Sequence, residues 1–276
     1  MASAQTMVQE HRQQLMQLRA LADKDLRALL ALIGDGDVAR VRNALIEALP
    51  DVVAPYLTAS GELAAVMFED LRAEAGRRGT FYAETVPATL PASKVDATAR
   101  WAVAPLADES LGSSVLTRLS GSVGRSIMDA SRDTMALNGT REDVRFQRMP
   151  RPGCCAFCGM LASRPLYMAY RSEASASAVV GRGSTRTGFD ENGKRLSGAA
   201  GKGVHARGKR EIGAATHDDC HCVVVPLLGA EMTKLARLER EKYQEMYSQS
   251  LRGEHNERLD TTKQILSERR KYHGTR

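Results

Sequence analysis

Two short stretches, 154-CCAFC-158 and 217-HDDCHC-222, contain all five cysteines of this 276-residue chain. Cysteine and histidine at such spacings are typical of structural zinc sites, in which four sulfur or nitrogen atoms surround the ion. Two cysteines separated by two residues can bind one ion from a single turn, and two separated by one residue share a face of an extended segment. The pattern therefore predicts one Zn2+ site that joins the two stretches and pins the strands of a small α+β unit.

The predicted ligands are Cys155, Cys158, Cys220 and Cys222. His217 either replaces one of these thiolates as a ligand or contacts a ligand without binding the metal itself. Cys154 is expected to be a bystander, because Cys155 already has the two-residue spacing from Cys158. The alternatives are reduced cysteines without a metal and a disulfide between the stretches. A site rich in thiolates is closed to water, which favours a structural over a catalytic metal.

The segment 181–210, between the two cysteine stretches, has eight basic residues, two acidic residues and eight glycines. Its formal excess equals the net charge of the whole chain, +6. So many glycines predict a flexible loop without regular helix or strand, and the charge favours a polyanion such as DNA as partner. The alternative is a solubilising insertion without a partner. The candidate DNA contacts are Arg182, Arg186, Lys194, Arg195, Lys202, Arg207, Lys209 and Arg210.

Apolar periodicity and turn residues predict an α+β fold that is predominantly helical. Residues 1–139 form a helical docking region, 140–228 a small zinc-stapled α+β module with the basic loop 181–210, and 229–276 a helical tail. The expected helices cover 4–33, 38–49, 52–75, 97–107, 110–137, 156–164, 230–251 and 256–272, and the expected strands cover 144–149 and 222–226.

The first helices are expected to expose an aliphatic stripe for docking that includes Leu15, Leu18, Leu29 and Ile33, unless these side chains form the core. The two tail helices carry many charges and weak apolar faces, which suits an exposed tail that docks on another subunit or a helix that is merely solvated. No apolar run approaches the roughly 20 residues of a membrane span, so we expect no membrane partner and a reducing cytoplasm.

Four segments together resemble the minor head proteins of tailed phages: Trp101 with 105-PL-106, 129-DASRDT-134, 148-RMPRPGCCAFCGMLASR-164 and 217-HDDCHCVVVP-226. The resemblance covers roughly residues 95 to 228. The most similar group is that of actinobacterial-phage proteins encoded beside the portal, which are related to the phage Mu F-like (MuF-like) head morphogenesis family. Cys154 departs from the usual pattern, in which a small residue that is not a ligand stands at that position.

The resemblance implies a minor capsid protein of the virion head, present in the host cytoplasm during capsid assembly. Its partners would be the portal, scaffold and major capsid proteins and the packaged DNA, and it would act in procapsid assembly and in genome packaging or delivery. Members of this group are often labelled capsid maturation proteases, which is the alternative function. The sequence has no G-x-S-x-G elbow to support a protease, although catalytic groups can assemble in space from distant residues.

A third hypothesis is a nuclease-like module, in which His205, Arg207, Lys209 and Arg210 would stabilise phosphate charge. A glycine-rich loop positions such side chains poorly for catalysis, so this hypothesis is the weakest of the three.

Overall fold

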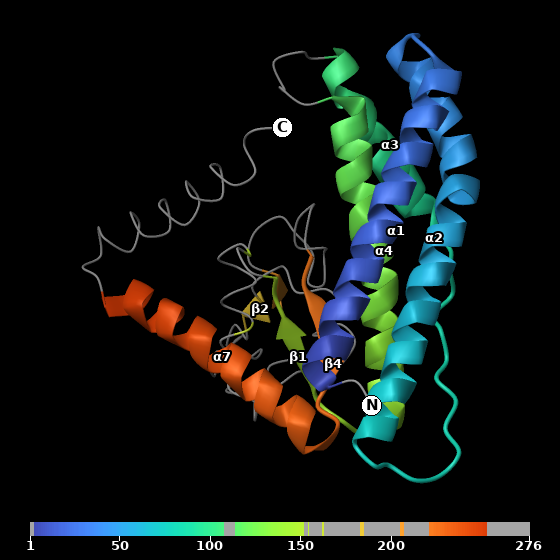
Figure 1. Ribbon diagram of the computed structural model, residues 1–276. Helices are drawn as coiled ribbons and strands as arrows, with labels where there is room; N and C mark the ends of the chain where they lie inside the picture. Colours follow the sequence, from blue (N-terminus) through green and yellow to red (C-terminus); the bar gives the residue numbers. More distant parts are fainter. Residues whose placement is uncertain are drawn as a thin grey trace, which may run out of the picture.

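A computed structural model describes residues 3–107, 114–151, 154, 162, 183–184, 205–206 and 221–252. Most of these residues are helical, and four helices form an upright bundle (Figure 1). They are α1 (Ala4–Ile33), α2 (Val38–Glu74), α3 (Ala92–Ala107) and α4 (Val115–Arg141). A two-stranded sheet and helix α7 (Gly229–Arg252) lie beside the end of the bundle at which α1 begins (Figure 1).

The ends of the first two helices follow their capping residues. Ser3 accepts a hydrogen bond from the backbone N–H of Thr6 at the start of α1, and Asp37 accepts one from Arg40 at the start of α2. Gly34 and Gly76, which follow α1 and α2, have φ of 65° and 67°, a conformation that glycine adopts without steric cost. The predicted break around residues 34–37 and the end of the helix before Gly76 are therefore confirmed.

Helix α2 differs from the prediction in one respect. The sequence predicted two helices, 38–49 and 52–75, but a single helix of 37 residues runs through Pro50 and Pro55. Its buried side chains keep a spacing of four residues across both prolines, at Val41, Leu45, Leu49, Val53 and Leu57. Burial of this continuous apolar stripe outweighs the hydrogen bond that each proline removes.

Helix α4, which packs against α1, α2 and α3, also ends later than predicted. Asn138 and Gly139 were expected to terminate it, but the helix continues to Arg141. Gly139 has a packing role instead, because a Cβ added there would lie 2.1 Å from the Phe146 ring. The Asn138 amide holds the connector 75–91 by donating to the carbonyl oxygen of Glu84 (2.7 Å) and accepting from its backbone N–H (2.9 Å).

The sheet consists of β1 (Phe146–Met149) and β4 (Val223–Pro226), which pair antiparallel with Phe146 opposite Pro226 and Met149 opposite Val223. Both predicted strands are confirmed, and all eight of their residues are buried. Within the basic segment, β2 (Gly183–Ser184) pairs with β3 (His205–Ala206). The prediction that glycine would exclude strands from this segment was therefore wrong for these four residues, since a backbone ladder needs no side chain.

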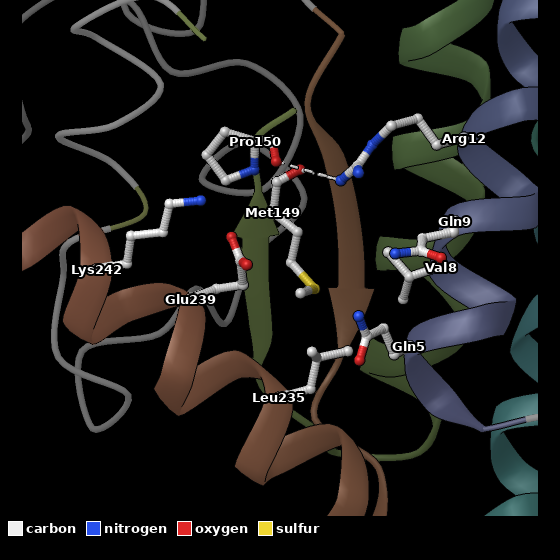
Figure 2. A pocket seen from close by; sticks show the side chains of 9 residues that line it. All are labelled: Gln5, Val8, Gln9, Arg12, Met149, Pro150, Leu235, Glu239 and Lys242. Atoms are coloured by element: carbon white, nitrogen blue, oxygen red, sulfur yellow. Dashed lines mark hydrogen bonds between the residues drawn. The ribbon is translucent and has the colours of Figure 1, made fainter. Parts of the chain in front are cut away.

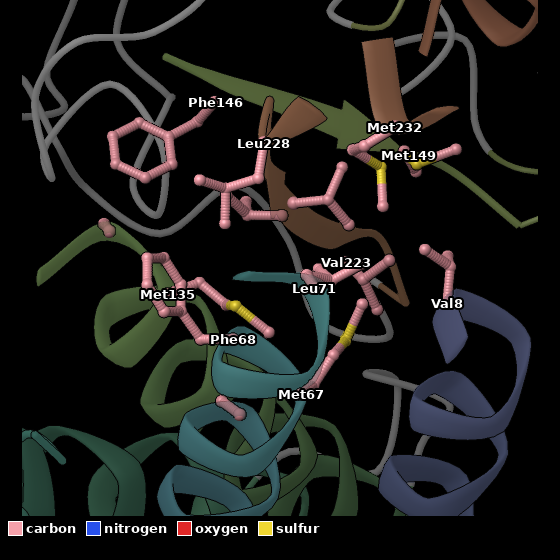
Figure 3. Packing of buried hydrophobic residues seen from close by; sticks show 14 of the residues in the cluster. Val8, Met67, Phe68, Leu71, Met135, Phe146, Met149, Val223, Leu228 and Met232 are labelled. Carbon is pink, nitrogen blue, oxygen red and sulfur yellow. The ribbon is translucent and has the colours of Figure 1, made fainter. Parts of the chain in front are cut away.

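Two apolar clusters stabilise the molecule. One fills the end of the bundle away from the sheet, around Leu26, Leu49 and Ile127. The other joins the bundle, the sheet and α7, as Figure 3 shows for Phe68, Met135, Phe146, Val223 and Met232 among others. The bundle, the sheet and α7 thus share one continuous core.

This packing corrects two expectations about docking surfaces. Leu15 is completely buried, and Leu18, Leu29 and Ile33 pack against the clusters, so the predicted stripe belongs to the core. The exposed aliphatic side chains of α1 include Leu21 and Leu32. Helix α7 confirms the predicted helix 230–251, but it is not an exposed tail, because Met232, Ala236 and Tyr243 are buried. The expected helix 256–272 lies outside the described residues.

Candidate metal centre

The pairing of β1 with β4 brings the two cysteine stretches to the same end of the sheet. The first stretch follows the last residue of β1, Met149, by five residues, and the second ends directly before the first residue of β4, Val223. Because the strands are antiparallel and Met149 lies opposite Val223, the chain leaves β1 and returns to β4 at one point. Met149, which leads into the first stretch, and Cys222, which ends the second, are therefore attached to the same end of the sheet.

Of the five predicted ligands, Cys222 is the one that the structure describes. It is 1% exposed, and its carbonyl oxygen accepts a hydrogen bond of 2.9 Å from Nε of Arg132 on α4. Cys155, Cys158, His217 and Cys220 lie outside the described residues, as do the eight candidate DNA contacts and most of the predicted helix 156–164. Within the described part of the chain, no group of three metal-binding side chains is assembled.

Cys154, the predicted bystander, lies close to the same site. Its backbone N–H donates to the carbonyl oxygen of Arg151 (3.1 Å), which also accepts a longer hydrogen bond from the Tyr243 hydroxyl of α7 (3.4 Å). Burial raises the pKa of Tyr243 well above its usual value, and the charge of Cys154, its hydrogen bond with the phenol and the charge of Cys222 add to the effect. Cys154 and Cys222, 68 residues apart, thus both act on one tyrosine.

Two arginines of the bundle hold the chain on either side of this point. Nη2 of Arg12 on α1 donates to the carbonyl oxygens of Met149 (3.2 Å) and Pro150 (3.3 Å), as Figure 2 shows. Arg132 holds the Cys222 carbonyl and also pairs with Asp129 (2.8 Å). Burial lowers the pKa of Arg12, and the negative charges of Cys222 and Glu239 oppose that effect. The bundle therefore fixes the backbone of both strands where the cysteine stretches begin and end.

A small hollow lies beside Arg12, between α1, β1 and α7 (Figure 2). Its volume is about 100 Å³, which is below the roughly 300 Å³ of the smallest typical ligand pockets. It gives room for water rather than for an organic substrate. The lining residues are Gln5, Val8, Gln9, Arg12, Met149, Pro150, Leu235, Glu239 and Lys242.

The structure also contains a serine–histidine pair that bears on the protease alternative. Nε2 of His11 on α1 and Oγ of Ser131 on α4 are 2.9 Å apart, and both residues are buried. Burial, with a smaller effect from the charge of Arg12, lowers the pKa of His11 to about 4, so the imidazole is neutral at pH 7. Among the described residues no group hydrogen-bonds Nδ1 of His11. A buried pair without an orienting carboxylate links two helices and is not arranged to attack a peptide.

Sequence reasoning assigned no role to Arg12, Arg132, Arg148 and Tyr243. Arg132 and Arg148 occur in the segments that carry the phage resemblance, but a single sequence does not show that they are buried. For Arg12 and Tyr243 the sequence gives even less indication of a role. Each lies among other polar residues of a long helix, and its hydrogen-bond partner in or next to β1 is far away in the chain.

No curated protein and no solved structure matches this chain. In the described residues no helix is long and apolar enough to cross a membrane. A protein-family comparison matches residues 1–250, a range that contains the bundle, both cysteine stretches, the sheet and nearly all of α7. The chain therefore belongs to the VG15 protein family.

Proposed function

We propose that this protein is a minor capsid protein of a tailed phage that acts in head morphogenesis. We further propose that a structural Zn2+ ion joins the two cysteine stretches of its module, residues 140–228. The observation that carries the proposal is the common origin of the two cysteine stretches at the Met149–Val223 end of the sheet. These stretches also lie within two of the four segments on which the resemblance to phage head proteins rests. Membership of the VG15 family over 250 residues supports a role for the bundle and the module as one unit.

The residues present fit a thiolate zinc site in their chemistry. Cys222 is buried as a structural ligand must be, and the backbone of Cys154 bonds the Arg151 carbonyl that also accepts from Tyr243. Cys155, Cys158 and Cys220, with His217, would complete the set. Bound zinc would supply a rigid cross-link across the 58 residues between Cys158 and His217, whose closure in the unfolded chain is entropically unfavourable.

The metal is tested by elemental analysis and chelation of the full chain. We expect one equivalent of zinc in the purified protein and a loss of stability on chelation, because metal binding is coupled to folding. Cys222→Ser should abolish zinc binding, whereas Cys154→Ser serves as the matched control and should retain it. Folded protein without metal would refute the zinc site.

The basic segment is proposed to contact packaged DNA. Replacing its eight Lys and Arg residues by Gln or Ser should weaken DNA binding and flatten the dependence of log affinity on log salt, by roughly one unit for each phosphate that the variant no longer neutralises. The zinc content should not change. An unchanged affinity and slope would identify the segment as solubilising only.

The role in the head is tested with particles assembled without this protein. A structural role predicts a major capsid protein of normal mass in particles of poor infectivity. Uncleaved capsid protein or retained scaffold would instead support the maturation protease. Because the buried leucines belong to the core, the docking test uses the exposed pair Leu21→Ser with Leu32→Ser, which should block incorporation into procapsids and leave the fold intact.

A further inference from the structure

Arg148, in β1, is buried, and the described residues provide no partner for its charge. Its relative exposure is 0%, and it is among the largest fully buried side chains of the described residues. In that part of the chain no group accepts a hydrogen bond from Nε, Nη1 or Nη2. A guanidinium ion keeps its proton under all ordinary conditions, so its burial is very unfavourable unless negative charge lies close to it.

The strand register indicates where that charge comes from. Arg148 lies opposite Val224, and Cys222 precedes Val224 by two residues. Side chains two residues apart in an extended strand share a face, and diagonal neighbours on paired strands are within reach of a long side chain. The register places Arg148 and Val224 on one face of the sheet, and Cys222, which directly precedes β4, lies two residues from Val224 at the Met149–Val223 end.

The two arginines that hold the backbone beside Cys222 and Met149 have partners of their own. Arg132 donates to the Cys222 carbonyl and pairs with Asp129, and Arg12 donates to the carbonyls of Met149 and Pro150. Asp129 in turn also lies 3.9 Å from the Lys94 ammonium. For Arg148, by contrast, the described residues provide no hydrogen-bond acceptor.

We propose that Arg148 is the buried counter-cation of the cysteine metal centre. This inference rests on the zinc site proposed above. A Zn2+ ion with four thiolates has a net charge of about −2, and with three thiolates and a histidine about −1. Such a centre and a buried guanidinium compensate each other: the arginine favours deprotonated thiolates next to Cys222, and the centre supplies the negative charge that Arg148 lacks.

The test compares zinc affinities of full-length variants by competition with a chelator. Arg148→Met keeps most of the apolar stem of the side chain and removes its charge, so the affinity should fall by about 10- to 100-fold, as for other groups that support metal ligands. Arg148→Lys, which keeps the charge, should lose less. The matched control is Arg145→Met, which removes the same charge from a half-buried position just before β1 and should change the affinity little.

Urea unfolding gives a second readout, because the effect of Arg148→Met on the unfolding free energy should differ in sign between the metal-free and the zinc-bound protein. In the metal-free protein, Arg148→Met should be at least as stable as the wild type, because it removes a buried uncompensated charge. With zinc bound, the wild type should be the more stable protein. If Arg148→Met does not fold, Arg148→Gln serves for the same comparison.

Wild-type zinc affinity in the neutral variants, or an Arg148→Lys loss as large as that of Arg148→Met, would overturn the counter-cation and leave the zinc site standing. A wild-type protein that binds no zinc would overturn both proposals.

Discussion

At the level of single residues, buried polar side chains join the helices of the bundle. His11 of α1 bonds Ser131 of α4, and Thr98 of α3 bonds Ser122 of α4 at 2.9 Å. Ser60 of α2 donates to the Ile127 carbonyl at 2.6 Å. Each bond satisfies groups that would be costly to bury alone, so these contacts specify how the helices pack as well as contributing stability.

The first prediction concerns His11 and pH. The folded protein holds the pKa of His11 near 4, against about 6.5 in the unfolded chain, so the unfolded state binds more protons between these values. The neutral imidazole therefore contributes stability that is present above pH 6.5 and is lost as the pH falls towards 4, in total roughly 3 kcal/mol. His11→Gln should lose less stability than the wild type between pH 7 and pH 4.5 in urea unfolding. Equal losses would show that His11 is not the group responsible.

The second prediction contrasts two glycines of the helices. Gly139→Ala would place a Cβ against the Phe146 ring and should cost about 1–3 kcal/mol of unfolding free energy, as overpacking does. Gly61→Ala is the control, because its Cβ would lie 3.4 Å from Oγ1 of Thr134, close to ordinary contact, and alanine favours the helix. Denaturant unfolding of both variants checks this, and equal stabilities would contradict the close packing of α4 on β1.

At the scale of elements, the bundle keeps helices intact where the local sequence would end them. Helix α2 passes through two prolines, and α4 passes through the Asn138-Gly139 pair. In α2 the side chains on either side of the prolines are buried, and in α4 Asn138 and Gly139 are themselves buried, Asn138 bonded to the connector and Gly139 packed on Phe146. The energy of that burial exceeds the local preference of one or two residues.

The third prediction follows for Pro50, which lies inside α2. Pro50→Ala restores a backbone donor to a helix that is already formed, so we expect an increase in unfolding free energy of roughly 1–3 kcal/mol. Pro87→Ala, in the connector before α3, is the control and should give no increase, because proline there restricts only the unfolded chain. Guanidinium unfolding at neutral pH measures both. A decrease for Pro50→Ala would mean that the proline itself shapes α2.

At the scale of the whole molecule, the module is not a separate body. Its strands contribute Phe146, Met149, Val223, Val224 and Val225 to a core whose other members come from α1, α2, α4 and α7. Arg12, Arg132 and Tyr243 hold the backbone next to both cysteine stretches from outside the module. The proposed metal centre would therefore depend on a frame that the bundle and α7 provide.

The fourth prediction tests that dependence. A fragment of residues 140–228 should bind zinc more weakly than the full chain and should aggregate, because one face of its sheet exposes apolar side chains that the bundle normally covers. Zinc competition and size-exclusion chromatography of the fragment and the full chain provide the measurement. A monomeric fragment with full zinc affinity would show that the cysteine stretches suffice for the fold.

The amino-acid sequence by itself determined the helical character of the chain, the break at residues 34–37, both strands of the sheet and the positions of the potential metal ligands. These features depend on neighbouring residues, through periodicity, hydrogen bonds to the nearest backbone groups and short ligand spacings. Only the tertiary structure decided that Leu15 belongs to the core, that α2 continues through Pro50 and Pro55 and that α7 packs against the bundle and the sheet. The same holds for Arg148, which is buried without a partner among the described groups. Those outcomes depend on contacts between residues tens of positions apart, whose burial free energy exceeds the local preferences that a single sequence displays.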